Sequence, residues 1–132
     1  MTGVQTCALP IGPLILGISG GAIGGAILRY VIQRAANLAF THPYGTLLVN
    51  VVGSFLIGLV AGFFLHRAYS VWYYAITAGF CGSFTTFSSI SLEVFEMLRM
   101  GDYWRALFYV GISLVSGLLA VALGWWLGMQ IQ

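Results

Sequence analysis

Four long stretches of this chain carry almost no charge, and that feature limits what the chain can fold into. A helix needs roughly 20 mainly apolar residues to cross the hydrocarbon core of a bilayer. Only 6% of the 132 residues are charged, against about 25% in an ordinary soluble domain. Because so little charge cannot cover a water-soluble globule, the sequence predicts a membrane protein. The stretches are residues 13–39, which contain two arginines, and residues 45–65, 68–92 and 106–132, which contain no charge.

These runs predict an all-α membrane protein with four transmembrane helices per subunit. Strands of a membrane barrel would alternate apolar and polar residues in blocks of about ten, and no such alternation is present. Four spans with short connections use nearly the whole chain and leave no room for a soluble domain. The expected organisation is a leader of doubtful origin at 1–12 and a four-helix transmembrane domain at 13–132, with spans at about 13–39, 45–65, 68–98 and 103–129.

The basic residues say little about partners or orientation. A net charge of +2 is too small to suggest nucleic acid as a partner. The positive-inside rule counts Lys and Arg near the helix ends, and the bias between the two sides is small, so a single orientation and an antiparallel dimer both stay open. One side has Arg34, Arg99 and Arg105, and the other has Arg67.

Glycines and isolated polar residues mark the first two spans. The stretch GISGGAIGGAILRY repeats glycines four residues apart, a spacing that lets helix backbones approach closely. Arg29 lies inside this span, where a cation needs a partner or water, so a structural anchor and a direct ligand role are both open. In the second span, Thr46 and Asn50 share a helix face. An asparagine in lipid must face the bundle interior, where Asn50 can bridge two helices or offer N–H donors to an anion.

The third span contains an unusually polar stretch, CGSFTTFSSISLE, at residues 81–93. Serine and threonine compete for backbone hydrogen bonds, so we expect the helix to break between Gly82 and Thr86. Irregular backbone at membrane depth survives only when it is buried in protein or lines a cavity. Its freed carbonyls suit a small hard cation such as sodium.

Beyond the expected break, the helical period separates two faces. Phe87 and Ile90 fall on one face, whereas Ser88 and Ser91 fall on the adjacent one. Glu93 then ends the polar stretch toward the membrane interface. This arrangement predicts an aromatic and apolar edge beside a row of hydroxyl groups.

The remaining polar groups suit the binding of a small anion and do not form a catalytic set. Tyr109, Ser113 and Ser116 make one stripe on the fourth span, although such hydroxyls commonly bond back to their own helix carbonyls. His42 and His66 are too few for a metal site, and Cys7 and Cys81 form no disulfide pattern. Hydroxyls, one amide and ring edges can contact an anion, so no enzyme and no organic cofactor are expected.

Three motifs, GGAIGGAILRY, GTLLVNVVGSF and GFCGSFTTFSSISLE, resemble in this order the CrcB/Fluc fluoride channels over roughly residues 14–128. The resemblance implies an antiparallel, dual-topology homodimer of four-helix subunits with two pores. It implies passive export of fluoride across a cell membrane, in bacteria the inner membrane, with membrane lipid around the dimer. It also implies a structural sodium ion at the dimer centre.

The resemblance carries over to individual residues. It assigns the fluoride pore to Thr46, Asn50, Phe87, Ile90, Tyr109 and Ser113, and the hydroxyl of Ser88 adds a donor to the expected anion path. It assigns the sodium to backbone carbonyls of Gly82 and Thr85. It further identifies Arg29 and Glu93 as the membrane arginine and the third-span glutamate of the family.

This chain departs from the family pattern at two of these positions. Ile90 stands where the second pore phenylalanine is usual, which removes one aromatic edge from each expected pore. Gly117 stands where some members have a further hydroxyl, and Ser116 lies about 100° around the helix from it. The pore ligands are therefore less firmly predicted than the fold.

Two other classes of function remain open on the sequence. A small four-helix multidrug-type exporter would need a proton gradient and a central acid, and the first two spans have no carboxylate. A membrane scaffold that transports nothing would be inert in flux assays and would copurify with a larger complex.

Overall fold

The computed structural model describes residues 10–40, 44–67 and 70–131. Residues 1–9 of the expected leader, with Cys7, and also His42 lie outside the described residues. Ile11 and Gly12, which the sequence analysis assigned to the leader, belong to the first helix. The elements are α1 (Ile11–Ala39), α2 (Tyr44–Phe63), α3 (Val71–Tyr74), the π-helix η1 (Ala75–Cys81), α4 (Gly82–Phe84), α5 (Phe87–Arg99) and α6 (Tyr103–Gln130).

Every regular element in the described part of the chain is helical, as predicted. Three of the helices, α1, α2 and α6, are long and apolar enough to cross a membrane. The remaining helical segment runs from α3 to α5 and is divided into shorter pieces. The end of α2 at Phe63 falls two residues before the expected boundary.

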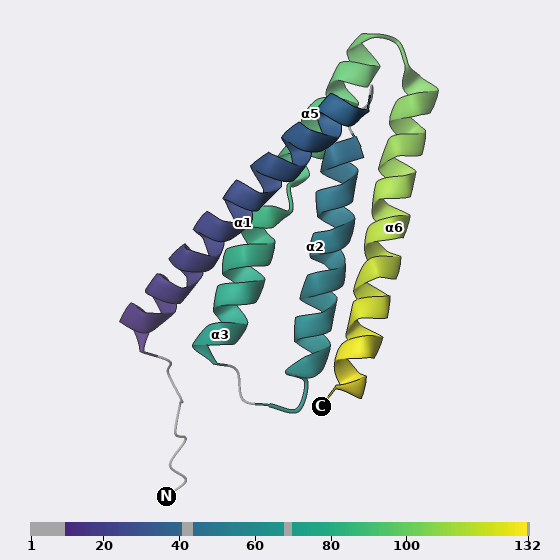
Figure 1. Cartoon of the computed structure of the whole chain (residues 1–132). Coiled ribbons are helices and arrows are strands. Elements are labelled where there is room, and N and C mark those ends of the chain that lie inside the picture. Colours follow the sequence, from purple (N-terminus) through teal and green to yellow (C-terminus); the bar gives the residue numbers. More distant parts are fainter. Residues whose placement is uncertain (1–9, 41–43, 68–69, 132) are drawn as a thin grey trace, which may run out of the picture.

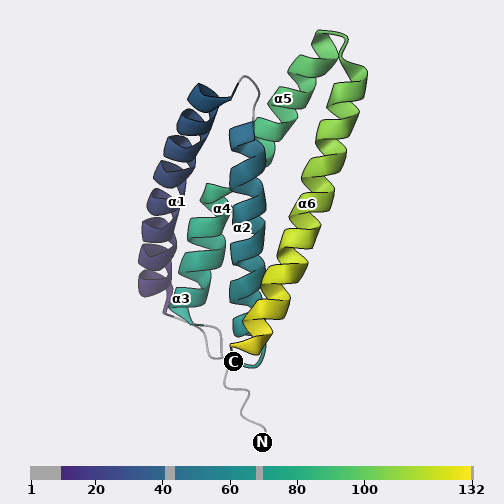
Figure 2. The same ribbon diagram turned by 45° about the vertical axis from the view of Figure 1, so that its right-hand side comes forward.

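The helices pack in two pairs that lie side by side (Figures 1 and 2). In one pair, α2 and α6 run in the same direction along most of their length, and in the other, α1 packs against α3, η1 and α4. The chain then passes through α5 to a tight turn before α6. Gly101 adopts a φ of 79° in this turn, a left-handed conformation that glycine takes without strain.

Glycines set the close approach within each pair. In α1, a Cβ on Gly21 or Gly25 would clash with the backbone of η1. The contact between α2 and α6 is reciprocal, because Gly58 of α2 meets the backbone of α6 and Gly124 of α6 meets the backbone of α2. Since lipid gives helices no hydrophobic drive to associate, such backbone contact is a main source of packing energy.

The segment from α3 to α5 changes its backbone conformation twice. The helix widens into η1, a π-helix, and such turns are often found at functional sites. Gly82 is still helical, with φ −62° and ψ −32°. The backbone becomes extended at Thr85 (φ −83°, ψ 159°) and Thr86 (φ −150°, ψ 112°) before α5 begins. The interruption therefore lies at the C-terminal side of the region in which the sequence predicted it.

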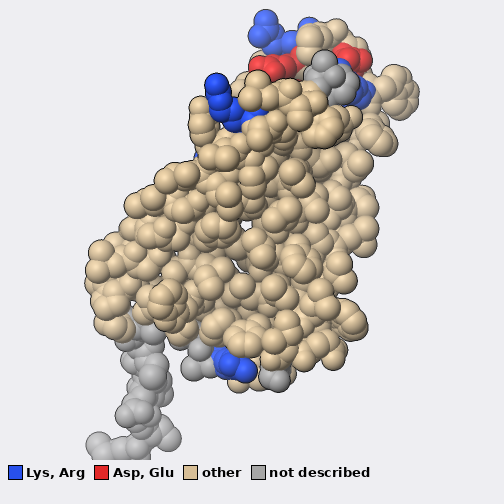
Figure 3. Space-filling view, in the orientation of Figure 1, with Lys and Arg blue, Asp and Glu red and all other residues tan. Residues whose placement is uncertain are grey.

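On the face drawn in Figure 3, charged side chains gather at the two ends of the molecule, with a belt free of charged side chains between them. Figure 3 shows arginines and acidic residues around the α5–α6 turn, with an arginine at the opposite end. Trp104 is 84% exposed beside the α5–α6 turn, and Trp72 is 74% exposed at the start of α3. Exposed tryptophans flanking an apolar belt are typical of residues at the two membrane interfaces.

We expect Gly21→Ala to destabilise the protein, because the added methyl group has no room against η1. Overpacking of this kind costs about 1–3 kcal/mol. Thermal unfolding of the purified protein in detergent, followed by circular dichroism, measures the effect. Gly20→Ala is the matched control, since no atom lies within 4 Å of its added Cβ. Equal unfolding temperatures for the two variants would contradict the packing derived for α1.

Candidate functional site

The interruption between α4 and α5 is held by one side chain from α2. Asn50 Oδ1 accepts a hydrogen bond from the backbone N–H of Thr86 at 2.7 Å, and Asn50 Nδ2 donates to the carbonyl of Thr86 at 3.2 Å. Both backbone polar groups of Thr86 are therefore satisfied outside any helix. The sequence left open whether Asn50 bridges two helices or faces an anion, and in this structure it makes the bridge.

The same arrangement redirects two N–H groups from the carbonyls that a continuous helix would use. In an unbroken α-helix, Thr86 N–H would donate to Gly82 and Ser89 N–H to Thr85. Here Thr86 N–H donates to Asn50, and Ser89 N–H donates to the Thr86 hydroxyl at 3.2 Å, which caps α5. The carbonyls of Gly82 and Thr85 are thus outside the helical ladder, and these are the two that the resemblance assigns to sodium.

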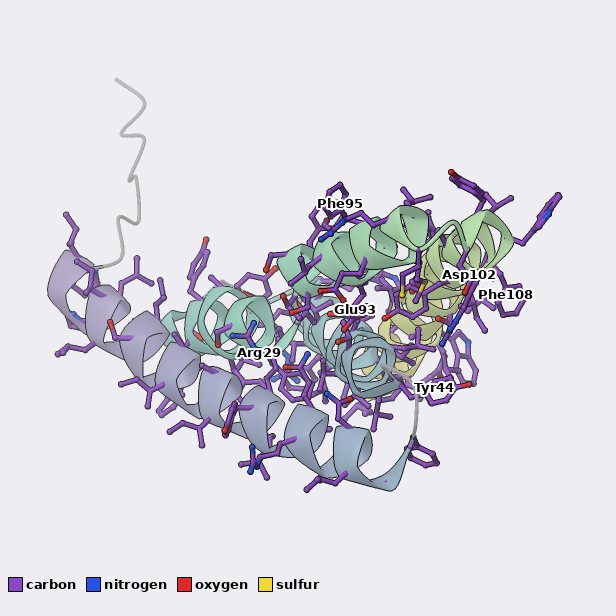
Figure 4. All side chains as sticks on the ribbon, turned by 90° about the horizontal axis from the view of Figure 1, so that it is seen from above. Arg29, Tyr44, Glu93, Phe95, Asp102 and Phe108 are labelled. Atoms are coloured by element: carbon purple, nitrogen blue, oxygen red, sulfur yellow. The ribbon has the colours of Figure 1, made fainter. Side chains whose placement is uncertain are left out.

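A second polar network gathers around Glu93 and joins four helices. The Thr46 hydroxyl donates to Glu93 Oε1 at 2.5 Å, and the Tyr109 hydroxyl donates to Glu93 Oε2 at 2.6 Å. Gln33 Nε2 donates to the Thr46 hydroxyl at 3.1 Å. The network therefore connects α1, α2, α5 and α6, and Figure 4 shows Glu93 between α5 and α2. The sequence placed Glu93 toward the interface, and in the structure its half-buried side chain lies beside Thr46 in the first turn of α2.

The polar positions of α2 and α6 lie at matching heights. Ser54 faces Gly117, whose added Cβ would lie 3.6 Å from the Ser54 hydroxyl oxygen. One helical turn earlier on each parallel helix come Asn50 and Ser113. Ser113 Oγ is buried without a hydrogen-bond partner among the described residues. A polar atom in that state is costly unless something else binds it.

Ser116 behaves differently from Ser113. Its hydroxyl donates to the carbonyl of Ile112 at 2.5 Å, one turn back on α6, and it lies on an exposed face. The prediction that such hydroxyls bond back to their own helix is therefore right for Ser116 and wrong for Ser113. Ser116 does not replace the hydroxyl that Gly117 lacks.

A hollow of about 270 Å³ opens beside the interruption. Phe87 and Ile90 both line it, as expected for two residues on the same face of α5, but their surroundings differ. Phe87 is 83% exposed, whereas Ile90 packs against the buried cluster of Met97, Ala106 and Tyr109. The hollow is lined by Asn50, Gly53, Ser54, Ile57, Cys81, Gly82, Thr85, Thr86, Phe87 and Ile90.

The polar residues next to the hollow are partly engaged with one another. Ser88 Oγ lies 3.1 Å from the Thr86 hydroxyl oxygen and shares a hydrogen bond with it. Ser91, on the exposed face of α5, donates to the carbonyl of Phe87 at 3.0 Å. Cys81 is a buried free thiol on the wall of the hollow. Within the described residues, no group of three His, Cys, Asp or Glu side chains could hold a metal ion.

Arg29 continues the glycine face of α1. It is half-buried one helical turn after Gly25, which packs against Phe80 and Ser83. Figure 4 shows Arg29 on the side of α1 that faces the other helices. In the ranges that the structure describes, no carboxylate pairs with Arg29. Its position beside the end of α4 fits both the anchor and the ligand role that the sequence left open.

Sequence reasoning missed two residues of the site. Gln33 enters the network around Glu93. Ser83 Oγ lies 2.9 Å from the carbonyl oxygen of Ala22 in α1 and 2.8 Å from that of Gly79 one turn back, and its single hydrogen can be donated to either. No pattern singles out Gln33, whereas Ser83 lies inside the polar stretch. The spacing of small residues in α1 could have indicated that a helix with a polar side chain packs there.

The comparisons with known proteins agree with this architecture. Residues 16–125 match the family described as CrcB-like protein, Camphor Resistance (CrcB). The chain belongs to the CrcB family. Membership and the long apolar helices together make it a multi-pass protein of the cell membrane. The resemblance found in the three motifs is thereby confirmed.

Several relatives are similar to this CrcB protein over most of both chains. The fluoride-specific ion channel FluC of Leptospira interrogans serovar copenhageni is 40% identical over 120 residues, covering 86% of this chain and 92% of the relative. That of Francisella tularensis subsp. mediasiatica is 35% identical over 127 residues, covering 89% and 95%. That of Bacteroides fragilis strain YCH46 is 39% identical over 122 residues, covering 87% and 94%.

We expect Tyr109→Phe to destabilise the bundle, because it removes one of the two hydroxyl donors to Glu93. Hydrogen bonds between membrane helices contribute about 1–2 kcal/mol at most, so the loss is expected in that range. Thermal unfolding in detergent measures it. Ser116→Ala is the control, since that hydroxyl bonds only within α6 on an exposed face. An unchanged unfolding temperature for Tyr109→Phe would mean that Glu93 does not join the helices as described.

Proposed function

We propose that this CrcB protein is a fluoride-selective channel that lets fluoride leave the cell passively across the cytoplasmic membrane. The observation that carries the proposal is the relatives named fluoride-specific ion channel, at 35–40% identity over most of both chains. A bacterial inner membrane is the expected location. The function proposed is transport and involves no chemical reaction.

The polar groups between α2 and α6 support an anion path. Asn50 uses one Nδ2 hydrogen on Thr86, and its amide nitrogen carries a second. Ser113, at the same height on α6, offers a hydroxyl that is buried and unpartnered among the described residues. Fluoride is a small anion that accepts hydrogen bonds strongly, so these donors can replace part of its lost hydration. Thr46 and Tyr109, one turn away, would extend the path toward Glu93.

We further propose that two copies form an antiparallel dimer with two pores. The polar interruption at Thr85 and Thr86 cannot face lipid, and a second copy across this region would cover it. The exposed side of α5 there carries Phe87, Ser88 and Ser91. In such a dimer, Phe87 of each subunit would present its ring edge to a pore.

A sodium ion at the centre of the dimer fits the backbone of the interruption. The carbonyls of Gly82 and Thr85 lie outside the helical ladder because their usual donors bond to side chains. Carbonyl oxygens are hard ligands, and unwound helix segments in membrane proteins bind sodium in this way. Carbonyls from two subunits would hold the ion, which would tie the two interruptions together.

Fluoride efflux from liposomes tests the proposed function. The purified protein is reconstituted into vesicles loaded with potassium fluoride, and a fluoride electrode records efflux after a potassium ionophore is added. We expect rapid efflux of fluoride and none of chloride from vesicles loaded with potassium chloride. Efflux no faster than from protein-free vesicles would overturn the proposal. Transport that needs an imposed proton gradient would favour an exporter.

We expect Asn50→Asp to abolish fluoride efflux. The substitution removes the donor to the Thr86 carbonyl and places a negative charge in the path of an anion. Efflux from liposomes and size-exclusion chromatography of the variant are measured together, so that a folding defect is recognised. Asn37→Asp on the exposed side of α1 is the matched control. A well-folded Asn50→Asp variant that conducts fluoride would remove Asn50 from the pore.

We expect Ile90→Phe to keep the channel conducting. The substitution restores the phenylalanine that is usual in the family, and Ile90 already lines the hollow beside the interruption. The same efflux assay measures the outcome, with Ile57→Phe, which lines the hollow from α2, as a comparison. Loss of conduction in Ile90→Phe alone would mean that the contact of Ile90 with the Met97 cluster has no room for a ring.

A further inference from the structure

Helix α1 enters the network around Glu93 through Gln33 alone among its described residues. Gln33 is half-buried, and its Nε2 lies 3.1 Å from the hydroxyl oxygen of Thr46. Thr46 is itself only 4% exposed. Few other groups can therefore reach this hydroxyl from the side of α1.

The chemistry of the four groups sets the direction of each hydrogen bond. The hydroxyls of Thr46 and Tyr109 both donate to Glu93, one to each carboxylate oxygen. With its one hydrogen given to Glu93, the Thr46 hydroxyl can only accept from Gln33. Gln33 must therefore present its amide N–H to Thr46. The hydrogen bonds then run in one direction, from Gln33 to Thr46 and from Thr46 to Glu93.

A close approach of α1 to α2 allows Gln33 to reach its partner. Gly45 precedes Thr46, and a Cβ there would lie 2.9 Å from Gln33 Cα and 3.2 Å from Ala36 Cβ. A larger residue at position 45 would hold the helices apart. The contact is thus built by the backbone of α2 as well as by the amide of Gln33.

We infer that Gln33 is a positioning residue that holds the hydroxyl oxygen of Thr46 in place and leaves its hydrogen directed to Glu93. The amide N–H of Gln33 donates to the hydroxyl oxygen of Thr46 and holds that oxygen in place. Only the hydroxyl hydrogen of Thr46 can then rotate. That hydrogen points to Glu93 at rest and can swing to a passing anion, while the bond from Gln33 is kept in both orientations. This last step rests on the proposed function, whereas the resting orientation does not.

Gln33→Glu tests the direction of the bonds, because an ionised carboxylate at this position only accepts. It would compete with Glu93 for the hydrogen of Thr46 and would repel Glu93. When protonated, the new carboxyl regains one donor and restores the original direction. The charged or titratable groups around it are Glu93 on α5, Tyr109 on α6 and, on α1 itself, Arg29 one turn earlier and the residues Tyr30 and Arg34 that line a hollow with Gln33.

The experiment compares three variants with the wild type between pH 8.5 and pH 4.5. Fluoride efflux from liposomes and thermal unfolding in detergent are both measured, and each variant is expressed as a ratio to the wild type at the same pH. For Gln33→Leu we expect a fall in efflux of roughly 3- to 10-fold at all pH values, as the loss of one hydrogen bond implies. Asn37→Leu, which replaces an exposed amide one turn along α1, should match the wild type.

For Gln33→Glu, we expect a larger defect than for Gln33→Leu at pH 8.5 and recovery toward the wild type as the pH falls. The same recovery should appear in the unfolding temperature, which does not depend on fluoride transport. If the wild type shows no fluoride efflux but the unfolding temperature of Gln33→Glu still recovers as the pH falls, the proposed channel function is rejected. The role of Gln33 in positioning Thr46 is then retained. A Gln33→Glu variant without pH dependence in either measurement, or one equal to the wild type at pH 8.5, would overturn the inference.

Discussion

The pair of hydrogen bonds between the Asn50 amide and the backbone of Thr86 is the constraint on which the rest of the site depends. A residue outside any helix at membrane depth carries two polar groups that lipid cannot satisfy, and Asn50 satisfies both. Because Thr86 is held in this way, its hydroxyl is free to cap α5. The carbonyls of Gly82 and Thr85 then leave the helical ladder, and the hollow opens beside them.

Helix pairs and polar contacts have separate roles in this architecture. Glycines bring backbones together within each pair, as at Gly21 against η1 and Gly124 against α2. Between the pairs, the contacts that carry polar chemistry are the Asn50 bridge and the network around Glu93. The proposed anion path follows this second kind of contact, because hydrogen-bond donors are found there and the glycine contacts leave no space for an ion.

Periodicity and composition predicted the broad plan, and long-range pairing decided the details. The apolar runs predicted the helices, and hydroxyl-rich sequence predicted an interruption. Gly82 nevertheless stays helical, and the backbone extends at Thr85 and Thr86. The local sequence could not predict this position, because the side chain that holds Thr86 belongs to Asn50, 36 residues away. The partners of Glu93 were missed for the same reason, since they come from other helices. The dimer and its sodium concern a second copy and stay predictions.

The glycine contacts also determine how the molecule can deform. Within a pair, the backbones already touch, so any change in their separation must compress or part many van der Waals contacts at once. Between the pairs, Gly45 of α2 approaches the backbone of Gln33 in α1, and the polar connections run through rotatable side chains such as Asn50 and Glu93. The separation of the backbones is therefore fixed more firmly within each pair than between the pairs, where a side chain can turn without moving a helix.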